Sequence, residues 1–118
     1  MSVNMTDQKL NMQLEILLGA KEDRHREGNV IKGTYSTSPK DYCNDPAASL
    51  EVQVAAIRVN AKKYFNHLER RIHPRLAELP ESEIWSAFEV AEIVRASPRQ
   101  RAEAAYMTLS SYPLREDI

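Results

Sequence analysis

The chain has 118 residues, of which 42% are hydrophobic and 28% are charged, and its formal net charge at pH 7 is −1. This length suits a single domain, 1–118, and the composition excludes a collagen-like, low-complexity or wholly disordered protein. The balance of acidic and basic residues also excludes a global basic field that would attract nucleic acid or anionic lipid.

The cysteine content and the first residues of the sequence indicate the cellular compartment in which we expect this protein. Cys43 is the single cysteine, so an internal disulfide is excluded and a reducing environment is favoured. No run approaches the roughly 18 apolar residues of a membrane span, and residues 1–7 lack the basic and apolar regions of a signal peptide. We therefore expect a cytoplasmic protein with no membrane role.

The first predicted element is an amphipathic helix over residues 7–18. Thr6 is a good N-cap, and Gly19 supplies a stop. Four leucines recur at about one helical turn. They are Leu10, Leu14, Leu17 and Leu18.

The segment 20–45 is predicted to be largely irregular, with one short hairpin near 29–36. Its charged run 21–27 has no apolar anchor and should be solvated or mobile. An irregular segment of this length is unusual in a compact domain without a functional reason. We therefore expect a partner-contact surface here, with Tyr35 and Tyr42 as its aromatic candidates.

The clearest element is a long helix over 46–73, the start of a helical core that spans 46–110. Asp45 is a good N-cap, and Pro46 fits the first turn, where its missing N–H costs nothing. Apolar residues at intervals of three and four then predict one continuous buried stripe of about seven turns. They are Leu50, Val54, Ile57, Ala61, Tyr64, Phe65, Leu68 and Ile72.

Two further helices are predicted, over 81–95 and 98–110. The apolar run 84–94 also has strand-like residues, but helix is favoured because strict alternation fails. The second helix begins with a capping box, in which Ser97 caps, proline follows and Gln100 closes the box. Its small buried side would let another helix approach closely. That side comprises Ala102, Ala105, Tyr106 and Leu109.

Nothing in the sequence predicts catalysis, a metal or a cofactor. The histidines lack metal-ligand spacing, and the three glycines are too scattered for a phosphate-binding loop. Cys43 lies beside Asp41 and Asp45, whose charges would raise the pKa of its thiol and oppose a nucleophilic role. We expect no enzyme.

Two basic clusters are candidate contact sites. Arg95, Arg99 and Arg101 surround a helix N-terminus, where cations are unfavourable, so they could hold an anion or an acidic protein patch. The alternative is that they serve neighbouring carboxylates or the end of the preceding helix. The second cluster lies on the long helix and could contact nucleic acid, although nearby glutamates dilute it. It comprises Lys62, Lys63, Arg70, Arg71 and Arg75.

Two patches carry a resemblance to a known family. Residues 41–52, with a tyrosine, aspartates and paired alanines opening a helix, resemble small phage proteins of the "phage ABA sandwich" type. Residues 97–105, Ser-Pro-Arg-Gln-Arg-Ala-Glu-Ala-Ala, are similar to their closing helix. The resemblance implies a small accessory protein encoded by a phage or prophage. Proteins of that kind, anti-CRISPR and other anti-defence factors among them, often act by occupying the surface of a host protein.

These observations predict a mainly α domain with the 46–73 helix as its spine, and α+β as the alternative. The leading functional hypothesis is a non-enzymatic phage or prophage protein that binds a host protein complex in the bacterial cytoplasm, as an anti-defence inhibitor. The alternative is a small nucleic-acid-binding regulator that uses the basic face of the long helix. A homodimer is also expected, because the apolar surface exceeds what so few elements would cover. The expected core comprises Leu50, Val54, Ile57, Phe65, Leu68, Trp85, Phe88 and Leu109.

Overall fold

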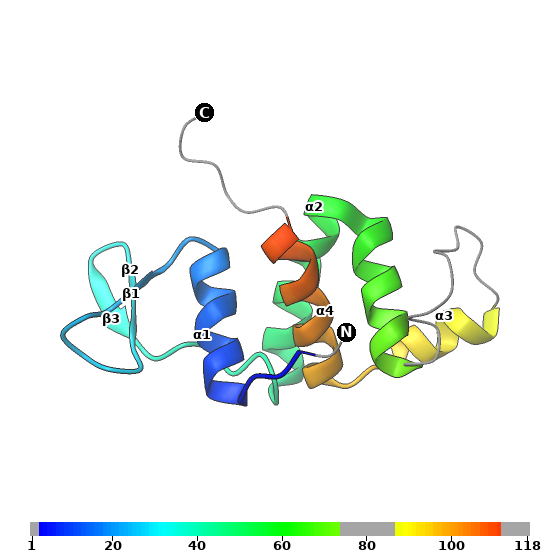
Figure 1. The fold of residues 1–118 in the computed structure, drawn as a ribbon, viewed down its shortest axis with the longest axis horizontal. Coiled ribbons are helices and arrows are strands. Elements are labelled where there is room, and N and C mark those ends of the chain that lie inside the picture. Colours follow the sequence, from blue (N-terminus) through cyan, green and yellow to red (C-terminus); the bar gives the residue numbers. More distant parts are fainter. Residues whose placement is uncertain (1–2, 74–86, 112–118) are drawn as a thin grey trace.

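A computed structural model gives the fold, and it describes residues 3–73 and 87–111, apart from the side chains of Phe88 and Glu89. The described helices are α1 (Asp7–Leu17), α2 (Pro46–Ile72), α3 (Ala87–Val94) and α4 (Pro98–Ser111). The strands are β1 (Lys21–Glu22), β2 (Val30–Lys32) and β3 (Tyr35–Thr37). The chain is therefore mainly α with a small sheet, which confirms the predicted fold class. In Figure 1 the sheet lies at one end of the long axis, α1 beside it, and α3 at the other end.

The helices α1, α2 and α4 begin where local chemistry predicts. Thr6 and Asp45 each accept a hydrogen bond from a backbone N–H in the first turn of their helix, at 3.2 and 3.0 Å. Ser97 and Gln100 form the predicted capping box, with reciprocal bonds of 3.1 and 2.9 Å. Gly19, which follows α1, has a φ of 109°, a conformation that favours glycine. The capping side chains of Thr6, Asp45, Ser97 and Gln100 pair backbone N–H groups that a helix start would otherwise leave without a partner.

The long helix α2 is broken at Asn60, which has extended backbone angles (φ −164°, ψ 97°). The Asn60 Oδ1 accepts a hydrogen bond from the backbone N–H of Lys63 at 3.0 Å, so Asn60 caps a second helical segment. Figure 1 shows that the two segments of α2 fold back on each other. The predicted continuous helix is therefore wrong at Asn60, although helix does extend over nearly the predicted range.

A hydrogen bond across the break shows how closely the two segments approach. The Tyr64 hydroxyl donates to the Gln53 Oε1 at 2.8 Å. Residues eleven apart on a straight helix are separated by about 16 Å along its axis. The bond therefore depends on the reversal at Asn60.

We expect Asn60→Ala to destabilise the protein by about 1 kcal/mol, because it removes the cap of the second segment. Urea denaturation followed by circular dichroism measures this change. Asn4→Ala, at an exposed position outside the helices, is the matched control. Equal or greater stability of Asn60→Ala would show that alanine's helix propensity outweighs the cap, contrary to this account of the break.

The core lies mainly between α2 and α4, the elements in most extensive contact. The first segment of α2 buries Ala48, Val52 and Ala56, which cluster with the buried alanines of α4. The side chains of Leu50 and Val54 are instead 45% and 47% exposed, so their predicted burial is wrong. Both faces of this segment are apolar, and the face with alanines is the one that allows close packing of two helices.

The remaining predicted core residues are Ile57, Phe65, Leu68, Trp85, Phe88 and Leu109. Leu68 and Leu109 are buried as predicted, and Ile57 and Phe65 are half-buried against the same cluster. Trp85 and the side chain of Phe88 lie outside the described residues. The described part of the 81–95 segment, α3, is helical, as favoured over strand.

The segment 20–45 is more ordered than predicted. Its strands form an antiparallel sheet in the order β1-β2-β3, so the predicted hairpin is confirmed and β1 is additional. Asp23, in the charged run expected to be solvated, is buried. Its carboxylate accepts hydrogen bonds from the Ser36 hydroxyl (2.6 Å) and the His25 backbone (2.9 Å), and these bonds lower the pKa of Asp23.

None of the described helices combines the length and the apolar character needed to cross a bilayer.

Candidate functional site

An open groove of about 480 Å³ lies where the end of α1, the β2–β3 hairpin, the loop before α2 and α2 itself meet. Most of it is formed by the segment that separates α1 from α2. It is lined by Glu15, Leu18, Gly19, Ala20, Lys32, Gly33, Lys40, Tyr42 and Glu51. Charged and apolar side chains therefore share one concave surface.

Glu15 is the buried charge of the groove. Its side chain is only 3% exposed, and its Oε2 lies 2.9 Å from the Lys32 Nζ. The same oxygen accepts a hydrogen bond from the Lys40 backbone N–H at 3.0 Å. A buried carboxylate needs such partners, because desolvation without them is costly. Glu15 therefore fixes the hairpin and the Lys40 loop against α1.

The rim of the groove carries a second, exposed ion pair. The Lys40 Nζ lies 2.7 Å from Glu51 Oε2, and both side chains are about half exposed. The hydrogen bond to Glu51 raises the pKa of Lys40, against a smaller opposing effect of burial. Exposed pairs of this kind contribute little to stability and can exchange partners. The rim can therefore offer either charge to a docking molecule.

The two tyrosines predicted for partner contact differ in accessibility. Tyr35 is 61% exposed and is the cross-strand partner of Lys32, which places it at the groove rim. Tyr42 is buried, and this burial together with the nearby Glu15 carboxylate raises its pKa. Tyr42 therefore forms part of the groove's floor and is not an exposed aromatic anchor.

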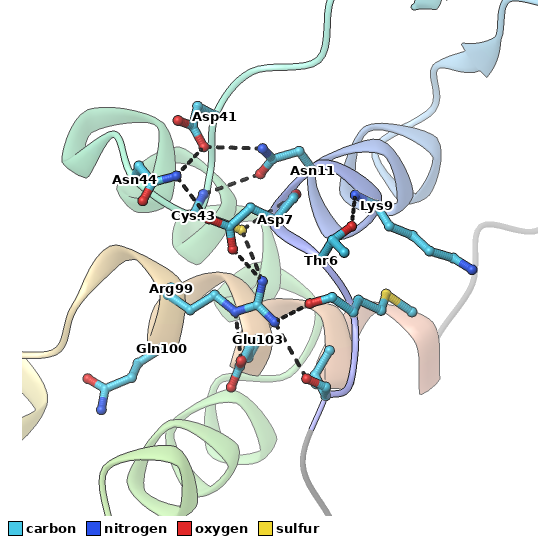
Figure 2. A network of polar contacts seen from close by, with 12 residues as sticks. Thr6, Asp7, Lys9, Asn11, Asp41, Cys43, Asn44, Arg99, Gln100 and Glu103 are labelled. Atoms are coloured by element: carbon cyan, nitrogen blue, oxygen red, sulfur yellow. Dashed lines mark hydrogen bonds and ion pairs between the residues drawn. The ribbon is translucent and has the colours of Figure 1, made fainter. Parts of the chain in front are cut away.

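Arg99 lies at the centre of a polar network that joins α4 to the N-terminal part of the chain (Figure 2). Its Nε is 2.7 Å from Glu103 Oε2, and its Nη1 is 2.7 Å from Asp7 Oδ1. Its Nη2 donates to the backbone carbonyl of Met5 at 2.8 Å. These partners occupy all three guanidinium nitrogens, so Arg99 joins parts of this fold and is poorly placed to bind a partner.

A neighbouring set of amides completes the network in Figure 2. The Asn11 amide donates to Asp41 at 3.1 Å, and the Asn11 carbonyl accepts from the Cys43 backbone at 3.2 Å. Asn44 donates to Asp7 and Asp41, both at 3.1 Å. The loop before α2 is therefore held against α1 by side chains.

The predicted basic cluster of Arg95, Arg99 and Arg101 does not form one contact site in the structure. Positions 99 and 101 are about 200° apart around a helix, and so they point to opposite sides of α4. The Arg101 Nη1 donates to the buried Ser49 of α2 at 3.1 Å. Arg95 is exposed after the last turn of α3. Of the residues predicted for partner contact, Arg95 and Tyr35 remain exposed, and Tyr35 adjoins the groove.

Cys43 is buried between α1 and α4, and its Sγ lies 3.7 Å from the Arg99 Nη1. Burial raises the pKa of the thiol from 9.0 to about 11, and Arg99 only partly opposes this effect. The sequence predicted the same direction of this pKa shift, but burial raises the pKa of the thiol more than the charge of Asp41 does. At neutral pH the group is a thiol, which is a poor nucleophile.

We expect Cys43 to resist iodoacetamide in the folded protein at pH 8 and to react readily in urea. Between about pH 9 and 11 the unfolded chain loses the proton that the folded chain retains, so stability falls as pH rises through this window. Mass spectrometry of alkylated protein and denaturation at several pH values measure both effects. Rapid alkylation of the folded protein would show that the thiol is accessible or ionised.

The basic residues of α2 spread over a wide arc. Going around the helix, Lys63 and Arg70 share one side, while Lys62 and Arg71 lie about 180° apart. Each of the four has a polar or electrostatic partner within the chain. Arg75 lies outside the described residues. The four described residues of this cluster therefore spread over about half of the helix circumference.

Apart from Tyr42, the residues that line the groove were not predicted as contact residues, although one signal was present. Asn11 and Glu15 are polar residues four apart beside the leucine stripe of the first helix, and both are buried. A carboxylate at such a position indicates a buried partner. The partners, Lys32 and Lys40, come from loop and strand geometry that periodicity does not reveal.

Among the described residues, no group of three or more histidine, cysteine or acidic side chains is arranged to hold a metal ion. Comparisons with protein-family models, with curated proteins and with solved structures gave no match.

Proposed function

We propose that the chain is a non-enzymatic protein-binding domain whose partner docks on the groove face. The groove face comprises Leu18, Lys32, Tyr35, Lys40 and Glu51. The observation that carries the proposal is the exposure of Leu18 (40%), which lines the groove, and of Tyr35 (61%), the cross-strand partner of the lining residue Lys32. Exposed tyrosines are enriched in protein interfaces, where they often serve as anchors.

The kind of partner follows from the resemblance and from the charges of the face. Two cationic and two acidic side chains lie in or around the groove, so the groove suits a protein surface of mixed charge better than a uniform polyanion. The resemblance of residues 41–52 and 97–105 to small phage proteins supports a phage or prophage origin. The proposed partner is then a bacterial host protein complex, which this accessory protein would inhibit by occupying its surface.

The test is affinity capture of a partner from nuclease-treated bacterial lysate. Leu18→Ala with Tyr35→Ala removes both anchors from exposed positions, and we expect at least about tenfold less partner to be captured. Val94→Ala, on the exposed side of α3, is the matched control and should capture as much as wild type. Equal capture by the anchor variant, or capture that nuclease abolishes, would contradict the proposal.

A further inference from the structure

The first segment of α2 has an outward apolar face in addition to the face packed on α4. Ala47, Leu50 and Val54 lie within about 60° of one another around the helix. Leu50 and Val54 are 45% and 47% exposed, and Ala47 is also exposed. A helix that is apolar on opposite sides normally packs on both of them. We call these three residues, with Glu51 and Arg58 beside them, the α2 outer face.

The charges of the α2 outer face are complementary to those of a second copy. Glu51 and Arg58 are seven residues apart, so they lie on the same flank and about 10 Å apart along the axis. Val54 lies close to the midpoint between them. If two copies pack antiparallel about a two-fold axis near Val54, each Glu51 meets the Arg58 of the other copy. One surface then supplies both halves of a closed, isologous interface.

We propose that two copies of this chain associate through the α2 outer face as an antiparallel helix pair. Leu50 and Val54 form its apolar centre, and two Glu51–Arg58 pairs lie at its flank. Glu51 already contacts Lys40 but its side chain is 56% exposed, which leaves its carboxylate accessible to a second cation. The proposal does not depend on the groove face having a partner.

Sedimentation equilibrium over a wide concentration range tests this association. Wild type should be a reversible dimer, and Val54→Glu should weaken the dimer by at least about 100-fold, because two carboxylates would face each other near the axis. The position is exposed in a single copy, so the fold should persist, as circular dichroism will show. Val94→Glu, at an exposed valine of α3, is the matched control and should dimerise as wild type does.

A charge exchange tests the orientation of the two copies. Arg58→Glu alone brings like charges together at both flanks and should weaken the dimer about tenfold, whereas Glu51→Arg combined with Arg58→Glu should restore it. A monomer at every concentration would overturn the proposal. A dimer insensitive to Val54→Glu would show that another face is used. Failure of the exchange to restore association would overturn the antiparallel pairing.

Discussion

Replacing Arg99 with alanine is expected to destabilise the protein by about 2–3 kcal/mol. The substitution removes a guanidinium that bonds Glu103, Asp7 and the Met5 carbonyl at 2.7–2.8 Å. These partners belong to α4, α1 and the chain before α1, so one side chain holds three parts of the fold together. At this chain length the change lowers Tm by about 10 °C.

Differential scanning calorimetry measures the loss, and Arg95→Ala is the matched control. Arg95 is exposed, so its substitution should change stability by less than about 0.5 kcal/mol. Arg99→Lys should recover little of the stability that Arg99→Ala loses, because an ammonium group cannot reproduce the three-nitrogen fork of a guanidinium. If Arg99→Ala and Arg95→Ala are equally stable, the network in Figure 2 does not hold the N-terminal part of the chain.

The second large effect is expected for Tyr64→Ala, which should destabilise the protein by about 3–5 kcal/mol. Tyr64 is fully buried, packs edge-on against Phe65 with ring centroids 5.2 Å apart, and bonds Gln53 across the break in α2. Tyr64→Phe keeps the ring and loses only the hydrogen bond, so about 1 kcal/mol is expected.

Chemical denaturation of the two variants separates packing from hydrogen bonding at Tyr64. Tyr35→Ala is the control, because that tyrosine is exposed and its loss should leave stability nearly unchanged. A loss below about 1 kcal/mol for Tyr64→Ala would be inconsistent with a core residue that holds the two segments of α2 together.

The sequence predicted the helix starts well because capping is local chemistry. Thr6, Asp45 and the Ser97–Gln100 box each need only a few neighbouring residues to be recognised. The reversal at Asn60 was missed because the apolar pattern continues on both sides of it. Asparagine is a common N-cap, but within a periodic run it is also read as an ordinary polar residue of a helix.

The buried side of α2 was misassigned for a different reason. Leu50 and Val54 have the same spacing as Val52 and Ala56, so periodicity alone does not decide which pair faces the core. The deciding factor is the partner helix: the alanines of α4 pack against small residues. The groove depends on similar long-range information, since Glu15, Lys32 and Lys40 meet only after the sheet has formed against α1.

The most direct test of the proposed partner-binding role is hydrogen exchange of the chain with and without its captured partner. If the proposed role is correct, the partner protects amides around the groove, in residues 18–20 and 32–35 and in the loop near Lys40. Protection confined to the segment from Lys62 to Arg71, with none around the groove, would contradict it and favour the basic side of α2 as the binding site.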